Sequence, residues 1–137
     1  MNTAQRIGLF VIAAASCVVG AWAQLFPRSF YDDFPGMGRT WVALDGPFNE
    51  HLVRDVGGLN LALAVVAGSG LLFRHPLLAR VAGAAALVYG LPHLLYHATH
   101  ADTFGTGDAA AMLVSLTLNV IAATLTFAPA RPAAVHP

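Results

Sequence analysis

The sequence predicts an all-α fold, an antiparallel bundle of four transmembrane helices. Hydrophobic residues make up 57% of the 137 residues and charged residues only 10%, whereas about a quarter of the residues in an ordinary soluble domain are charged. Four apolar runs account for the excess, and each is close to the ~20 residues that a helix needs to cross a bilayer. The second and third connections are short, so consecutive helices are expected to be antiparallel neighbours.

The four runs form one integral membrane domain that covers residues 1–137. They are residues 7–26, 52–73, 77–96 and 109–127. The first run also has features of a secretory signal peptide, but it is long for a signal core, and we interpret it as the first transmembrane helix. Glycines in the second and third runs favour close packing of helix backbones in lipid.

The one long connection, residues 27–50, is expected to fold. It holds three prolines and five aromatic residues, which are Phe30, Tyr31, Phe34, Trp41 and Phe48. This aromatic content is high for a flexible linker, and Trp and Tyr are enriched where a membrane meets water. We therefore expect a folded cap at the membrane interface.

The arginines predict how the bundle is oriented. Four of the seven lie at the N-terminus, in the second connection and in the C-terminal tail, while all seven acidic residues lie on the other side with the remaining three arginines. The four are Arg6, Arg74, Arg80 and Arg131. The positive-inside rule then puts both termini in the cytoplasm and the long connection outside, with the protein in the inner (plasma) membrane. A neutral chain without a basic patch gives no reason to expect a nucleic-acid partner.

The segment "GLPHLLYHATHAD" carries the most specific pattern in the chain. His93, His97 and His100 recur at spacings of four and three residues, so a helix would present all three on one face. We call these three residues the histidine stripe. Counting equal distances from the short turn at His75 places His51 and Asp55 level with the stripe on the neighbouring helix. The sequence therefore predicts one cluster of histidines and acids at the outer membrane face.

Imidazole and carboxylate groups are ligands for transition metals. The candidate metal ligands are His93, His97, His100 and His51, for zinc, copper or iron. His51 and His93, on facing helices, are candidate axial ligands for haem. Asp55 and Glu50 are candidate catalytic residues, each as a ligand or proton acceptor. The leading hypothesis is a metal- or haem-binding membrane protein, for which oxidoreduction of a lipophilic substrate or quinone is one activity; whether the chain is an enzyme is left open.

Three other interpretations are weighed against this one. The histidines can be interfacial structure without a ligand. The chain can be a non-enzymatic accessory or assembly subunit that packs against a larger membrane complex or against copies of itself. It can also be a small carrier that uses Asp55, His93 and two asparagines, Asn60 and Asn119. The two asparagines fall at one depth, and a structural hydrogen bond between them is expected.

The residues "PRSFYDDFPG…GPFNEHLVRDVGGLNLALAV…LPHLLYHATH" resemble a group of small, uncharacterised four-helix membrane proteins from actinobacteria, which is loosely similar to the DoxX-like class. The resemblance covers nearly the whole chain and implies a four-helix bundle. The DoxX-like class has loose links to redox systems of membranes. A cysteine-based redox role is not expected here, because Cys17 is the only cysteine.

Overall fold

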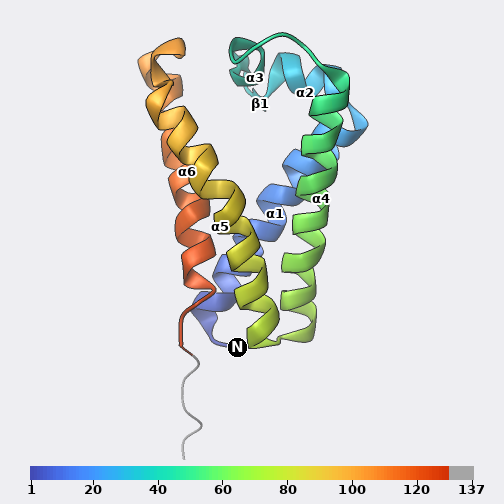
Figure 1. Ribbon diagram of the computed structural model, residues 1–137, viewed down its shortest axis with the longest axis vertical. Coiled ribbons are helices and arrows are strands. Elements are labelled where there is room, and N and C mark those ends of the chain that lie inside the picture. The colour runs from blue at the N-terminus through green and yellow to red at the C-terminus, as the bar shows by residue number, and fades with distance from the viewer. Residues whose placement is uncertain (130–137) are drawn as a thin grey trace, which may run out of the picture.

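The computed structural model describes residues 1–129, which are helical apart from one small hairpin and the connections (Figure 1). The elements are α1 (Thr3–Leu25), α2 (Pro27–Asp33), β1 (Pro35–Gly36), β2 (Arg39–Thr40), α3 (Trp41–Leu44), α4 (Glu50–Phe73), α5 (Pro76–Thr99), the 3-10 turn η1 (Ala101–Thr103) and α6 (Thr106–Leu125). Among the described residues, α1, α4, α5 and α6 are long and apolar enough to cross a membrane. The prediction of four such helices is confirmed.

Three of the long helices, α1, α4 and α5, begin before the apolar runs because polar residues cap them. The side chains of Asn2 and Asn49 accept hydrogen bonds from backbone N–H groups in the first turns of α1 and α4. The ring of His75 accepts one at the start of α5. Such caps satisfy N–H groups that have no partner within the helix. Each of these helices therefore starts at its cap and not at its first apolar residue.

The four long helices meet closely at one end of the bundle, which holds the N-terminus and the α4–α5 turn and is called the lower end below (Figure 1). The core there consists of Leu9, Ile12, Ala67, Ala79, Ala82 and Ala123. Gly8 of α1 and Gly83 of α5 both lie against backbone carbonyls of α6, and a Cβ at either position would collide with them. Small residues thus allow close backbone approach, as is usual for helices packed in lipid.

Towards the opposite, upper end the helices separate into two pairs, α1 with α4 and α5 with α6 (Figure 1). The first pair stays in close contact. A Cβ on Gly57 would lie 2.5 Å from the backbone nitrogen of Gln24, and one on Gly20 would lie 2.8 Å from that of Leu61. Because each pair holds together while the pairs diverge, a space opens between them.

The long first connection folds into a cap across the upper end; residues 27–49 are called the cap below (Figure 1). Its aromatic side chains pack over a second small core formed by Ala23, Phe30 and Val53. Its two strands are antiparallel and turn at Met37 and Gly38, whose φ angles of 58° and 76° are both positive. This is the backbone geometry of a tight two-residue hairpin turn.

The described arginines that predict the cytoplasmic side lie at the same end of the bundle. Arg6, Arg74 and Arg80 lie towards the lower end, in the first turns of α1 and α5 and in the turn between α4 and α5. Arg131 lies outside the described residues. The cap lies at the other end. Which end faces the cytoplasm stays a prediction.

Gly57→Ala is expected to destabilise the bundle by about 1–3 kcal/mol, because the new methyl group would meet the Gln24 backbone and push α1 away from α4. The measurement is thermal unfolding of the detergent-purified protein by circular dichroism. Gly68→Ala on the same helix is the control, since nothing lies within 4 Å of a Cβ there. That control should be neutral or stabilise by ~0.5–1 kcal/mol. Equal effects of the two substitutions would contradict the close contact.

Candidate ligand pocket

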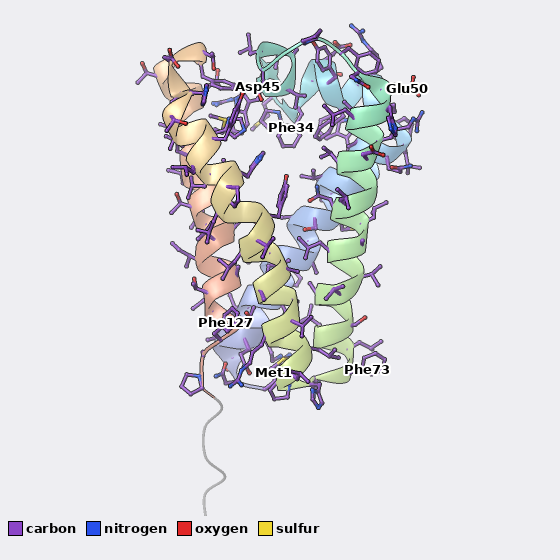
Figure 2. All side chains as sticks on the ribbon, in the orientation of Figure 1. Met1, Phe34, Asp45, Glu50, Phe73 and Phe127 are labelled. Atoms are coloured by element: carbon purple, nitrogen blue, oxygen red, sulfur yellow. The ribbon has the colours of Figure 1, made fainter. Side chains whose placement is uncertain are left out.

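A cavity of about 500 Å³ lies between the two helix pairs and beneath the cap (Figure 2). All four long helices and the cap contribute to its walls. Figure 2 shows Phe34 and Asp45, both of the cap, at the upper edge of this region. Small-molecule sites in proteins are typically ~300–1,000 Å³. The cavity, called the pocket below, is therefore large enough for an organic ligand.

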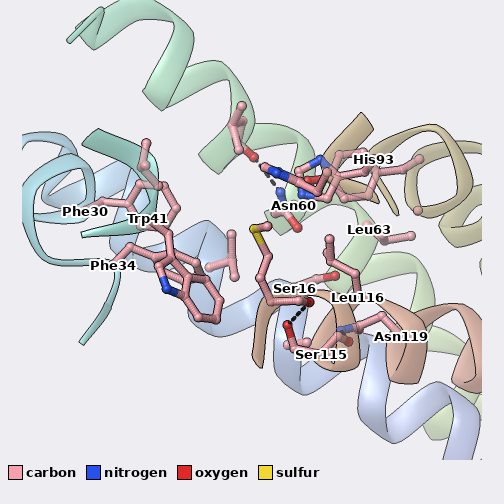
Figure 3. Close-up of a pocket in the computed structure, with 18 of the residues that line it drawn as sticks. Ser16, Phe30, Phe34, Trp41, Asn60, Leu63, His93, Ser115, Leu116 and Asn119 are labelled. Atoms are coloured by element: carbon pink, nitrogen blue, oxygen red, sulfur yellow. Dashed lines mark hydrogen bonds between the residues drawn. The ribbon is translucent and has the colours of Figure 1, made fainter. Parts of the chain in front are cut away.

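Most side chains that line the pocket are apolar. Those on the long helices are Ile12, Ala15, Val19, Leu52, Val53, Val56, Leu63, Ala86, Met112 and Leu116. The cap adds Phe30, Phe34, Trp41 and Val42, and the three aromatic side chains lie together on one side of the pocket (Figure 3). Phe34 and Trp41 pack edge to face, with ring centroids 6.1 Å apart. A lining of this kind favours a lipophilic ligand.

One group of polar side chains lies across the pocket from the cap aromatics and includes Ser16, Asn60, Ser115 and Asn119 (Figure 3). The two asparagines line one pocket, but the predicted hydrogen bond between them is not formed. Each amide nitrogen instead donates to a carbonyl one turn earlier in its own helix, at 2.9 Å for Asn60 and 3.0 Å for Asn119. The local bonds satisfy the amide donors because the pocket keeps α4 and α6 apart.

A second polar group brings two members of the histidine stripe to the pocket. His93 and His97 both line it, with ring centroids 4.8 Å apart, and Tyr89 stacks on His93 at 5.2 Å. His97 is only 9% exposed, and its Nδ1 atom is buried without a hydrogen-bond partner in the described structure. A buried polar atom without a partner is rare in native proteins and costly.

Asp45 of the cap is the acidic residue that the structure places beside these imidazoles. It lines the pocket and is close enough to His93 and His97 to act on both electrostatically. Its Oδ1 accepts a 3.3 Å hydrogen bond from the Tyr96 hydroxyl. Sequence reasoning missed Asp45, because nothing in residues 27–50 indicates which side chain folds back onto α5.

His100, the third member of the stripe, does not line the pocket. Its ring stacks on Tyr96 at 4.3 Å, and its Nδ1 lies 2.9 Å from the Tyr96 carbonyl oxygen. It therefore belongs to the exposed end of α5.

The predicted partners of the stripe on α4 lie elsewhere. His51 is exposed and approaches Asp55 of its own helix at 3.5 Å, while Glu50 pairs with Arg54 at 2.9 Å. None of these four residues lines the pocket. The prediction that His51 and Asp55 face the stripe is wrong, because residue counting assumed that α4 and α5 stay adjacent above their turn, whereas they diverge.

The metal and haem hypotheses gain no support from this geometry. In residues 1–129, no group of three or more His, Cys, Asp or Glu side chains is placed to hold a metal ion. His93 and His97 supply two nitrogens, fewer than the three protein ligands of a typical catalytic zinc site. The proposed haem pair is also separated, since His51 lies outside the pocket that His93 lines. Metal and haem binding stay predictions.

Besides the bond between Tyr96 and Asp45, two hydrogen bonds tie the cap to α6. Asp108, in the first turn of α6, accepts from Arg39 at 2.6 Å and from the Trp41 indole at 2.9 Å through the same Oδ1 atom. We call this three-residue contact the cap latch. Because Trp41 also lines the pocket, the latch holds one wall of the pocket in place.

No protein-family model, no curated protein and no solved structure matches the chain. The kind of protein is therefore inferred from the fold and the pocket alone. The described chain is an all-α protein with four helices long and apolar enough to cross a membrane, a feature consistent with a multi-pass membrane protein. The similarity to the DoxX-like class stays a prediction.

Asp108→Ala is expected to loosen the cap by about 1 kcal/mol, because Arg39 and Trp41 both lose their acceptor while part of the ion pair is already screened by solvent. Hydrogen–deuterium exchange should rise in residues 34–45 and stay unchanged in the lower halves of α1 and α4. Asp102→Ala, an exposed acid in η1, is the matched control. Unchanged exchange in the cap would show that the latch does not hold it.

Proposed function

We propose that this protein is a multi-pass membrane protein that binds a lipophilic small molecule in the pocket, with a quinone as the representative class. In this proposal the protein lies in the plasma membrane, with its termini in the cytoplasm and the cap outside. The observation that carries the proposal is a largely apolar pocket that two neighbouring imidazole rings, those of His93 and His97, line together.

Other polar groups at the pocket are also available to a ligand. Within the described residues, neither the Ser16 hydroxyl nor the His93 ring makes a hydrogen bond, and both residues line the pocket. In an environment this apolar, a ligand that supplies complementary groups would recover the free energy that such polar groups lose on burial. The pocket therefore favours a molecule with a few polar atoms on a largely apolar body.

The charge of the lining narrows the ligand class. Asp45 is the single acid or base, apart from the histidines, that lines the pocket in residues 1–129, and no arginine does. A phosphate or carboxylate ligand would have no cationic partner other than a protonated imidazole and would be repelled by Asp45. A neutral ligand is favoured for this reason.

The aromatic side chains favour a flat head group. Trp41 and Phe34 lie on one side of the pocket, and the stacked pair Tyr89 and His93 contributes from α5. Aromatic rings stack on or pack edge-on against a planar group. An imidazole N–H can donate to a carbonyl oxygen. A quinone ring, which is flat and carries carbonyl oxygens, satisfies both requirements.

Replacing His93 with Phe is expected to weaken the binding of a short-chain ubiquinone analogue at least about tenfold, because the hydrogen bond to the ring is lost while its shape and stacking are kept. Isothermal titration of the detergent-solubilised full chain measures the dissociation constant. His97→Phe should act in the same direction. His51→Phe is the control, since His51 lies outside the pocket. Equal affinities of the three variants, or no binding by the unmodified chain, would reject the proposal.

Elemental analysis of the same preparations separates this proposal from the metal hypothesis. A ligand-binding pocket without a metal is expected to leave the unmodified protein and a His93→Ala/His97→Ala variant equally low in transition metals. A stoichiometric metal ion that is lost in the double variant would replace the quinone proposal with a metal site.

A further inference from the structure

We propose that the pocket opens sideways into the bilayer between the upper halves of α4 and α5, and that an amphiphilic ligand enters there from the lipid. The polar head would lie beside His93 and His97 beneath the cap, and the apolar tail would remain in the opening. This inference rests on the proposed function for the nature of the ligand, whereas the opening itself is argued from the packing of the helices.

Two sides of the pocket and its roof are closed by close packing or by bonds. On the α1–α4 side, Gly20 and Gly57 bring the two backbones together. On the α5–α6 side, Gly83 lies against Thr126, and a Cβ on Gly90 would lie 3.6 Å from the side chain of Val120. The roof is the cap, which the latch holds on α6.

The side between α4 and α5 is open at the upper end. Asn60, Val56 and Leu52 line the pocket along one face of α4, and exposure increases from 7% at Asn60 to 60% at Leu52. Across the gap, Tyr89 of α5 lines the pocket and is nevertheless 45% exposed. Side chains that line a pocket and are this exposed are expected near its mouth. Figure 1 shows the upper halves of α4 and α5 apart at this level.

The outer surfaces of α4 and α5 are apolar. Large exposed side chains on them include Leu59, Leu91 and Leu95. With the bundle in a membrane, these surfaces face hydrocarbon. The mouth would therefore lead to lipid acyl chains, and a molecule dissolved among them reaches the pocket without crossing water. Polar groups at the inner end and apolar groups at the mouth match a molecule with a polar head and an apolar tail.

Carbene labelling from within the bilayer tests the opening directly. The full chain is reconstituted in phosphatidylcholine vesicles that contain a small aryl diazirine, which is photolysed, and labelled residues are mapped by mass spectrometry. Met112 and Leu9 are both buried, but only Met112 lines the pocket. Labelling at Met112 well above that at Leu9 is expected. Labelling of Met112 no higher than that of Leu9 would overturn the inference.

Two variants of the mouth establish the route. Tyr89→Ala should raise Met112 labelling at least about twofold, because a large ring is removed from the mouth; Leu118→Ala, an exposed position on α6 outside the pocket lining, is its control. Leu52→Trp should lower the labelling, with Val65→Trp, an exposed position on the same helix outside the pocket lining, as control. If mouth variants and controls give the same labelling, the probe arrives by another route and the proposed opening is wrong.

Competition with a long-chain ubiquinone distinguishes failure of the opening from failure of the proposed function. Protection of Met112 by the quinone supports both. Strong labelling of Met112 that the quinone does not reduce supports the opening and rejects the quinone as the ligand.

Discussion

The close backbone contact at the lower end is the constraint on which the rest of the structure depends. Gly8 and Gly83 let α1 and α5 lie directly against the carbonyl groups of α6, and alanines fill the space that remains. From this contact the two helix pairs diverge towards the upper end, while α1 and α4 stay together (Figure 1). The pocket follows from that divergence, and the cap is needed because the divergence leaves the upper end uncovered.

The sequence predicts the long helices well and the pocket only in part. Apolar length alone identifies the four helices, and the aromatic residues of the long connection indicate that it folds. The spacing of His93 and His97 correctly puts both rings on one helix face. The placement of His51 in the same cluster is wrong because counting from a turn gives depth but not the angle between helices. Asp45 and the latch contact of Asp108 depend on how the cap folds back, which no local pattern specifies.

Polar groups in the described bundle fall into two kinds. Gln5, in the lower end, donates to the Thr126 carbonyl at 3.1 Å and is fully buried there. Asn60 and Asn119 similarly donate within their own helices. These groups are satisfied by the fold itself. The His97 nitrogen is not. A buried polar group without a partner is uncommon in native structures, and here it belongs to a residue that lines the pocket.

The lower-end contact also makes each helix pair a lever. A helix of 24 residues such as α5 is about 36 Å long at 1.5 Å per residue. A rotation of roughly 5° about its lower end therefore moves its upper end by about 3 Å. The glycines and alanines of the lower end thus set the width of a cavity that they do not touch. Substitutions there would act on the pocket from a distance, through the angle between the two pairs and not through any contact with the ligand.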